Sequence, residues 1–182
     1  MDFFVISDIH GSSAALEKAL NIYKKGNFES IIICGDILYH GARNPLPEGY
    51  NPRGVIDLLN EVKGEIIAIR GNCESEVDQM VLDFPITGDY SYLYNGSRKI
   101  FITHGHKYSK ESLPPLKDGS IFLYGHTHIP DGSCLDGIYS LNPGSITLPK
   151  GDFPASYAIL TSTKWEVRNL MDSSLILSCI FN

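Results

Sequence analysis

The sequence lacks any apolar run long enough to cross a membrane. Its first apolar segment, residues 1–6, carries no basic residues and is soon followed by Asp8. A signal peptide needs a basic start and a longer apolar stretch, so we expect this segment to form a strand of the folded protein. The sequence therefore contains no indication of export or of attachment to a membrane.

Positive charge is also scarce. Lysine and arginine number 15 against 21 aspartates and glutamates, which leaves a net charge of −6. A protein that wraps nucleic acid needs clustered basic residues to contact the phosphates, so we expect no stable nucleic-acid complex. A small ligand is compatible with this charge.

Cysteine is sparse and shows no metal-binding spacing. The four cysteines are widely separated, with no CxxC pair: Cys34, Cys73, Cys134 and Cys179. This pattern argues against a structural zinc site built from cysteines. In a chain without an export signal, we expect reduced thiols and a cytoplasmic location.

Internal repeats, low-complexity segments and interdomain linkers are absent, so we expect a single domain over residues 1–182. The first half alternates strands and helices, and the second half is mostly strands. An α/β fold with two sheets packed face to face and helices outside them accommodates both halves.

The apolar periodicity and the turn residues place the individual elements. In the first half they predict strands at 3–7, 30–34 and 65–69, helices from Ser12 or Ser13 to Gly26, from Asn51 to Gly64 and over 75–83, and a long loop at 37–51. In the second half they predict a hairpin of 90–94 and 99–103 joined at Asn95-Gly96, then strands at 120–124, 138–141, 156–161, 165–170 and 174–180. The opening β-α-β order implies parallel strands whose carboxyl ends share one edge of a sheet.

Ligand-type side chains follow five of these strands. The segments are Asp8-Ile9-His10, Gly35-Asp36, Gly71-Asn72, His104-Gly105-His106 and Gly125-His126-Thr127-His128. Each motif alone has a local explanation, such as a turn cap or a pair of surface imidazoles. Five separate coincidences are needed to explain all of them, so we interpret the set as one functional site.

The types and spacing of these residues favour a metal site. In extended chain, residues two apart project to the same side, so Asp8 and His10 can share one centre, as can His126 and His128. Carboxylate, imidazole and amide donors suit divalent ions such as Mn²⁺, Fe²⁺ or Zn²⁺. Glycine beside most of these positions allows sharp turns and close approach to a ligand.

The order of these motifs resembles that of the calcineurin-like metallophosphoesterases: D-x-H, G-D, G-N, a lone H, then G-H-x-H, over residues 8–128. Further stretches at 7–12, 40–50, 70–80 and 142–145 resemble the YfcE-type bacterial phosphodiesterases. The resemblance implies a four-layer α/β/β/α sandwich of two mixed β-sheets flanked by helices. It also implies a metal-dependent phosphodiesterase that hydrolyses small phosphodiesters by in-line attack of a hydroxide bridging two metal ions.

Carried over by position, the resemblance assigns the ligands of a dinuclear centre. One ion would be held by Asp8, His10, Asp36 and His128, and the other by Asp36, Asn72, His104 and His126. Asp36 would bridge the two ions. The expected cofactors are two divalent ions, with Mn²⁺ favoured and Zn²⁺, Fe²⁺ or Ni²⁺ as alternatives.

The group that protonates the leaving alcohol is left open. Many members of the wider family have histidine after G-N, whereas this chain has Cys73, as the YfcE-type branch does. Cys73 is either a proton donor or, as we favour, a small packing residue. His106 is a candidate donor or a hydrogen-bond partner of the ligands. His40 and Arg43, on the 37–51 loop, are candidates for substrate binding, whereas Lys150 reads as an exposed turn residue.

Two other functions fit the same fold. One is a phosphomonoesterase, including a protein phosphatase, and the other is a non-catalytic interaction module. Modules of this kind typically lack part of the ligand set, whereas all seven positions are filled here. The sequence does not decide whether the chain assembles with copies of itself.

Overall fold

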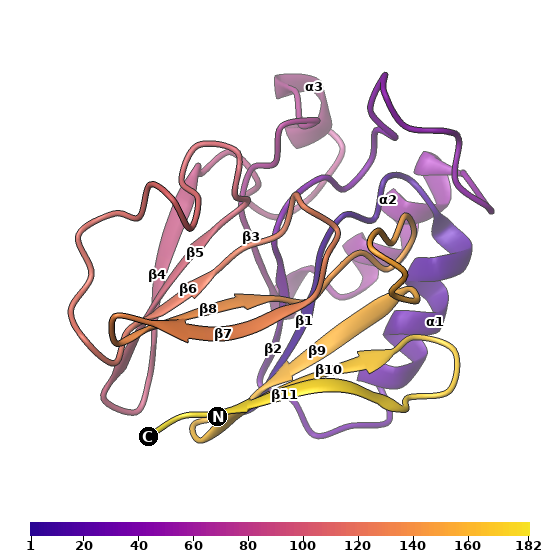
Figure 1. The fold of residues 1–182 in the computed structure, drawn as a ribbon. Helices are drawn as coiled ribbons and strands as arrows, with labels where there is room; N and C mark the ends of the chain where they lie inside the picture. The colour runs from indigo at the N-terminus through magenta and orange to yellow at the C-terminus, as the bar shows by residue number, and fades with distance from the viewer.

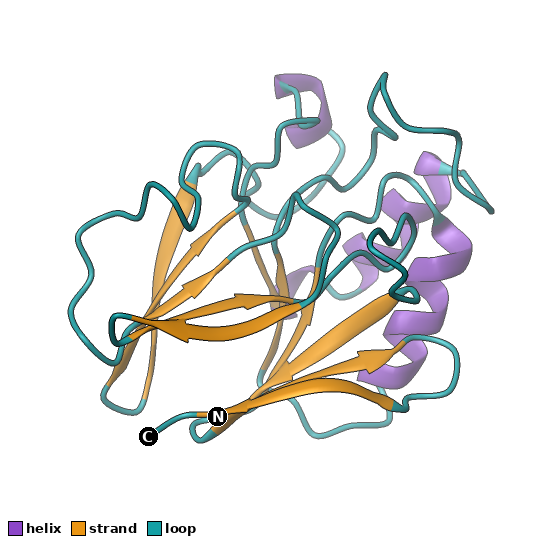
Figure 2. Ribbon diagram, in the orientation of Figure 1, coloured by secondary structure: helices purple, strands orange, loops and turns teal.

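The structure, a computed structural model, describes residues 1–182 and contains two β-sheets packed face to face (Figure 1 and Figure 2). The six-stranded sheet has the order β11-β10-β9-β1-β2-β3 and the five-stranded sheet the order β4-β5-β6-β8-β7. The strands of the first sheet are β1 (Phe3–Ile6), β2 (Ser30–Ile33), β3 (Ile66–Ala68), β9 (Ser156–Leu160), β10 (Lys164–Asn169) and β11 (Leu175–Ile180). Those of the second are β4 (Tyr90–Asn95), β5 (Arg98–Thr103), β6 (Ile121–Leu123), β7 (Asp131–Leu135) and β8 (Ile138–Asn142).

Strands β1, β2 and β3 are parallel neighbours, as the β-α-β pattern predicts. Strand β1 is buried along its whole length and pairs with β9 in the antiparallel direction on its other side. In the second sheet, β5, β6 and β8 are parallel, and β4 and β7 join them as antiparallel edges. Both sheets are therefore mixed, and their parallel strands deliver the segments that follow them to one end of the molecule.

Helices α1 (Ser13–Tyr23) and α2 (Pro52–Glu61) cover the outer face of the six-stranded sheet (Figure 1). The Ser12 side chain caps α1, and Asn51 caps α2 ahead of a proline at its first turn, so both predicted starts are confirmed. The apolar face of α1 is buried, and it packs against β1 and β2 in a cluster of 20 buried side chains.

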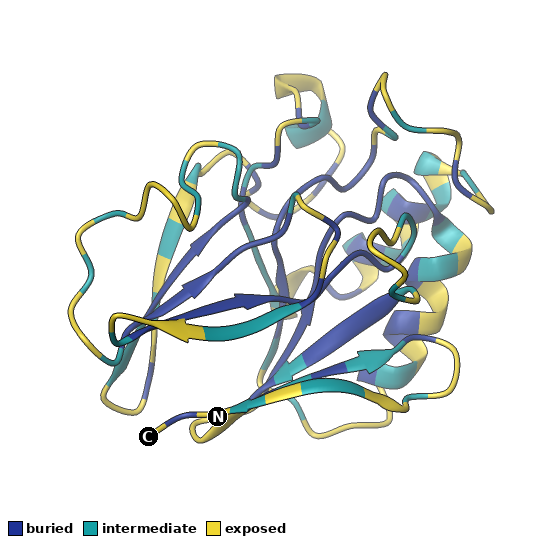
Figure 3. Cartoon of the chain, in the orientation of Figure 1, coloured by how far each residue is buried: buried dark blue, intermediate teal, exposed yellow.

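A second cluster of 16 buried side chains fills the space between the sheets. Trp165 and Phe3 of the six-stranded sheet belong to it, as do Ile102 and Leu123 of the five-stranded sheet. The inner strands of both sheets, among them β1, β6 and β8, are largely dark blue in Figure 3. This continuous apolar contact holds the ends of β1 to β3 beside the ends of β5 and β6.

The outer face of the five-stranded sheet is covered by the loop between β5 and β6. Phe101, Phe122 and Tyr124 of the sheet pack there against Tyr108 and Leu116 of the loop. The predicted class, α/β with two mixed sheets flanked by helices, is confirmed. On this side the outer layer consists of chain without regular secondary structure.

Three local expectations differ from the structure. Helix α3 (Glu76–Gln79) is shorter than the predicted 75–83, because the Gln79 side chain bonds Leu82 O and Phe84 O and organises the next residues as a loop. Strand β7 is not predicted by the sequence, since it is a half-exposed edge strand of residues that rarely favour strands. The hairpin turns at Gly96-Ser97, one residue later than expected, because Asn95 pairs with Arg98.

None of the helices combines the length and the apolar character that crossing a membrane requires.

Candidate metal centre

The loops that follow five strands meet at the upper edge of the two sheets in Figure 1. The six-stranded sheet contributes Asp8 and His10 after β1, Asp36 after β2 and Asn72 after β3. The five-stranded sheet contributes His104 after β5, and His126 and His128 after β6. Residues from both halves of the chain thus gather between the sheets.

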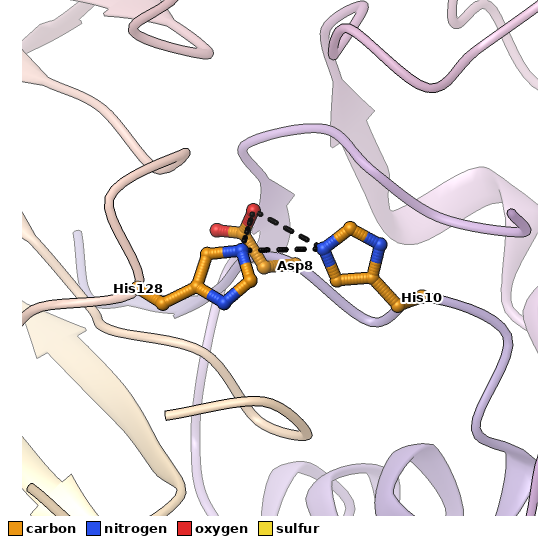
Figure 4. A group of neighbouring side chains, drawn as sticks. All are labelled: Asp8, His10 and His128. Atoms are coloured by element: carbon orange, nitrogen blue, oxygen red, sulfur yellow. Dashed lines mark hydrogen bonds and ion pairs between the residues drawn. The ribbon is translucent and has the colours of Figure 1, made fainter. Parts of the chain in front are cut away.

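Asp8, His10 and His128 form one compact group among these residues (Figure 4). Asp8 Oδ1 lies 3.2 Å from His128 Nε2 and 3.7 Å from His10 Nε2. The two Nε2 atoms are 3.3 Å apart. All three side chains are buried, although they come from opposite sheets.

The tautomers of these histidines follow from their partners. His10 Nδ1 lies 2.9 Å from Tyr39 O, and His128 Nδ1 lies 2.6 Å from Leu148 O. A carbonyl oxygen only accepts, so each Nδ1 carries the hydrogen, and each neutral ring has a lone pair on Nε2. When both rings are neutral, the two Nε2 lone pairs face one another and Asp8 Oδ1.

Asp8 Oδ1 is a buried oxygen without a hydrogen-bond partner. The other oxygen, Oδ2, accepts from the Ser7 hydroxyl at 2.6 Å and from the His126 backbone N–H at 3.1 Å. Such converging lone pairs repel one another unless a proton or a metal ion lies among them. The donor set, one carboxylate and two imidazoles, fits a divalent metal ion.

Asp36 connects this group to the remaining residues. Its Oδ2 atom lies 3.7 Å from His10 Nε2 and 3.4 Å from His104 Nε2. Its Oδ1 atom accepts the Cys73 backbone N–H at 2.9 Å. Burial raises the pKa of Asp36, but the hydrogen bond and charge of His104 outweigh it, so the carboxyl pKa lies well below its usual range.

His104 and Asn72 lie on the far side of Asp36. His104 Nδ1 is 2.6 Å from Cys34 O, and its Nε2 is 3.1 Å from Asn72 Oδ1. Burial alone lowers the pKa of His104, but the hydrogen bond to Asp36 and the charges of Asp8 and Asp36 raise it to about 9. The half-buried His126 ring has its centroid 5.0 Å from that of His104. The structure thus brings all seven predicted ligands together.

Glu74 holds the turns that carry Asp36 and Asn72. Its buried carboxylate accepts the backbone N–H groups of Asp36 at 2.9 Å, Ile37 at 2.6 Å and Gly71 at 2.5 Å. Burial and the charge of Asp36 raise the pKa of Glu74 to about 7. A Cβ on Gly71 would lie 2.2 Å from Asp36 Oδ1, so the two turns approach closely enough to require glycine there.

The backbone at the site adopts an uncommon conformation. Eight residues other than glycine have positive φ, and five of them are Asp8, His10, Asp36, His126 and His128. Backbone bonds from Asp8 N to Gly35 O and from His10 N to Asp36 O, at 3.1 and 2.9 Å, tie the first two turns together. Conformational strain is thus concentrated at the site, where surrounding contacts maintain it.

A cleft of about 760 Å³ is lined by four of the seven predicted ligands: Asp36, Asn72, His126 and His128. Of the other predicted residues, Arg43 and the half-buried Cys73 line it. His40 does not, because its ring packs 5.6 Å from that of Tyr50 and its Nδ1 lies 3.3 Å from Asn44 O. His106 does not line the cleft. Its ring centroid lies 5.4 Å from that of His104, and its buried Nδ1 has no hydrogen-bond partner.

Comparison with known proteins identifies the family. The model of the calcineurin-like phosphoesterase superfamily domain matches residues 1–164. The chain belongs to this superfamily. It is 44% identical to phosphodiesterase YfcE of Escherichia coli over 182 residues, covering 100% of this chain and 99% of that protein. This full-length similarity confirms the predicted enzyme class, a phosphoric ester hydrolase of the phosphodiesterase type.

Two solved structures and a second curated relative are also similar to this chain. The structure of YfcE, described as a phosphoesterase from E. coli, superposes with a TM-score of 0.98 over 100% of both chains. A probable metallophosphoesterase of Bacillus subtilis, YsnB, is 30% identical over 88% of this chain and 84% of its own length. A zinc complex of Vps29 from Entamoeba histolytica shares the fold at 20% identity, with a TM-score of 0.64 over 100% of both chains.

Sequence reasoning missed several groups of this phosphoesterase site. Lys150 is exposed, as expected, but it also lines the cleft, which the sequence did not indicate. The carbonyls of Tyr39, Leu148 and Cys34 orient the site histidines, and no pattern marks them because every residue has a carbonyl. Ser7, whose hydroxyl donates to Asp8, lies within a stretch that resembles the family, so its role could have been predicted from the sequence.

Proposed function

We propose that this phosphoesterase is a phosphodiesterase that hydrolyses small phosphodiesters at a centre of two divalent metal ions. The observation that carries the proposal is the convergence of the buried Asp8 Oδ1 with the Nε2 atoms of His10 and His128, 3.2 to 3.7 Å apart. A divalent metal ion fits these three donors, and the named phosphodiesterase relative is similar over its full length.

The proposed ligands fall into two groups that share Asp36. Asp8, His10, Asp36 and His128 would hold one ion, and Asp36, Asn72, His104 and His126 the other. Support for the sharing comes from Asp36 Oδ2, which lies between His10 and His104. A carboxylate is suited to this position because its charge offsets the repulsion between two cations.

Bound divalent ions would supply an activated water and neutralise charge on the phosphate. The residues of the chain then have positioning roles. Carbonyls fix the imidazole rings of the ligands, and the Cys73 N–H and Glu74 hold the Asp36 carboxylate and its turn. Donors of this type suit Mn²⁺, with Zn²⁺, Fe²⁺ and Ni²⁺ as competitors, so availability in the cell decides the metal.

Cys73 is proposed as a packing residue beside the site. Burial, followed by the negative charge of Asp36, raises the pKa of its thiol, and its backbone N–H makes the contact with Asp36. Diesters with good leaving groups, which need little protonation, should therefore be the best substrates. His106 is proposed to support the rings of His104 and His126, whose centroids lie 5.4 and 6.2 Å from its own.

The four cysteines form no disulfide in the structure, which is compatible with the proposed cytoplasmic location. The expected partner is a small diester, without a stable nucleic-acid complex, since the net charge is −6. We propose that residues 1–182 act as one domain, because the two sheets share a core.

Hydrolysis of bis(para-nitrophenyl) phosphate before and after chelation tests the proposal. Chelator should abolish the activity and Mn²⁺ should restore it, with two ions per chain by elemental analysis. Activity that persists without metal would contradict the proposal. Faster hydrolysis of the monoester para-nitrophenyl phosphate would favour a phosphomonoesterase, and full metal occupancy without any hydrolysis would favour a non-catalytic module.

A further inference from the structure

Two cationic side chains line the cleft without an acidic partner. Arg43 and Lys150 are both exposed and both face the same hollow as Asp36. The ion pairs formed by lysines and arginines of this chain involve other residues: Lys63, Arg70, Lys107, Lys110, Lys164 and Arg168. The guanidinium of Arg43 and the ammonium of Lys150 therefore remain available to a ligand.

Each cation lies on a segment that is tied to a site histidine. His128 donates from Nδ1 to Leu148 O, and Lys150 N donates back to His128 O at 3.2 Å. On the other loop, His10 donates to Tyr39 O, four residues before Arg43. The segments whose carbonyls orient the two imidazoles therefore also carry the two positively charged residues that line the cleft.

The turn that carries Arg43 is held by its own bonds. Asn44 N donates to Gly41 O at 3.0 Å, and the Asn44 side chain donates to His40 O at 2.8 Å. His40 thus supports the loop that presents Arg43, although it does not line the cleft itself. A turn closed in this way reduces the entropy lost when Arg43 binds a ligand.

The charge within the cleft is opposite to that of the protein. Asp36 is the single acidic residue among its lining residues, and it is already engaged with His104 and the Cys73 N–H. The whole chain carries a net charge of −6. Two unpaired cations in a polar hollow of an acidic protein indicate a ligand with more negative charge than one phosphodiester carries.

We propose that the substrate is a phosphodiester with a second anionic group, a carboxylate or a phosphate, and that Arg43 and Lys150 bind that group. This inference rests on the proposed phosphodiesterase function. The planar fork of Arg43 matches both kinds of anion, and Lys150 adds a point charge on the opposite loop. Arg43 and Lys150 would then determine specificity, whereas the scissile phosphate would bind to the metal ions that the seven ligands would hold.

A series of para-nitrophenyl phosphodiesters that differ only in the second alcohol tests the inference. The propyl ester is the uncharged reference, the carboxyethyl and phosphoethyl esters add an anion, and the choline ester adds a cation. We expect kcat/KM for at least one anionic ester to exceed that of the propyl ester about tenfold, the effect of one charged hydrogen bond. The choline ester should be the poorest substrate, and the two anionic esters distinguish carboxylate from phosphate recognition.

Arg43→Gln and Lys150→Gln should each reduce the anionic-to-propyl ratio several-fold, and the double variant should bring it close to one. Lys117→Gln is the matched control, because Lys117 is an exposed cation outside this cleft and in no ion pair. It should leave the ratio unchanged. A ratio near one in the wild-type protein, or the same loss in Lys117→Gln, would overturn the inference.

Binding provides a second measurement that does not depend on turnover. Calorimetry with carboxyethyl and propyl phosphonate analogues should show about tenfold tighter binding of the carboxylate, lost in the double variant. Equal affinity for both analogues would also overturn the inference. If no ester in the series is hydrolysed with any metal, the proposed function fails, whereas hydrolysis without charge preference refutes only the second anionic group.

Discussion

The Nε2 atoms of His10 and His128 lie 3.3 Å apart, and the Nδ1 atom of each ring donates to a backbone carbonyl. The two histidines come from the ends of β1 and β6, in different sheets. A metal ion held by both rings would link the two sheets at this edge. Metal binding and the stability of the sandwich should therefore be coupled.

We expect Mn²⁺ to raise the unfolding temperature of chelator-treated protein. An ion that binds only the folded state at a hundredfold excess over its Kd adds about 2.7 kcal/mol to the free energy of unfolding. Thermal unfolding with and without Mn²⁺ measures the effect. Asp8→Asn should gain less than the wild-type protein, and the absence of a shift with Mn²⁺, Zn²⁺, Fe²⁺ and Ni²⁺ alike would argue against the metal centre.

Asp36→Asn should reduce occupancy of both ions together. The Asp36 carboxylate lies within 3.7 Å of His10 Nε2 and 3.4 Å of His104 Nε2, so it reaches both groups of ligands. Asp8→Asn and Asn72→Ala should each affect mainly one ion, because the proposed assignment gives each of these side chains to one ion only. Metal content per chain by elemental analysis distinguishes these patterns, and one fully occupied ion in Asp36→Asn would refute the bridging role.

Gly71→Ala should destabilise the protein and weaken metal binding. The new Cβ would meet Asp36 Oδ1 at 2.2 Å and Asp36 N at 2.4 Å, so the Asp36 turn must shift. Such overpacking costs about 1 to 3 kcal/mol. Gly64→Ala is the control, because nothing lies within 4 Å of its added Cβ. Chemical denaturation should separate the two variants, and equal stabilities would show that the turn relaxes freely.

Cys73→Ser should retain much of the activity toward a diester with a good leaving group. The contact with Asp36 uses the Cys73 backbone N–H, which serine preserves. Rates with bis(para-nitrophenyl) phosphate for Cys73→Ser and Asp36→Asn provide the comparison. A loss in Cys73→Ser as severe as in Asp36→Asn would instead assign the thiol a direct part in the reaction.

The ligand set could be predicted from the sequence because each motif is local. A buried strand such as β2 is a short apolar run, and Asp36, three residues beyond its end, must emerge at the edge of the sheet. Helix starts at Ser12 and Asn51 are equally local, since a side chain caps the turn that follows it. Apolar runs, glycines and caps therefore determined the fold class and the cluster of candidate metal ligands.

Only the tertiary structure decided how these side chains are oriented. Leu148 lies 20 residues from the ring that its carbonyl orients, and Glu74 lies 38 residues from the Asp36 N–H that it accepts. Such contacts leave no pattern, because backbone groups are the same in every residue and the approach depends on how the two sheets pack. The sequence by itself thus determined which groups assemble at this edge. The packing of the sheets decided that the Nε2 atoms of His10 and His128 converge. It also decided that Arg43 and Lys150 line the same cleft.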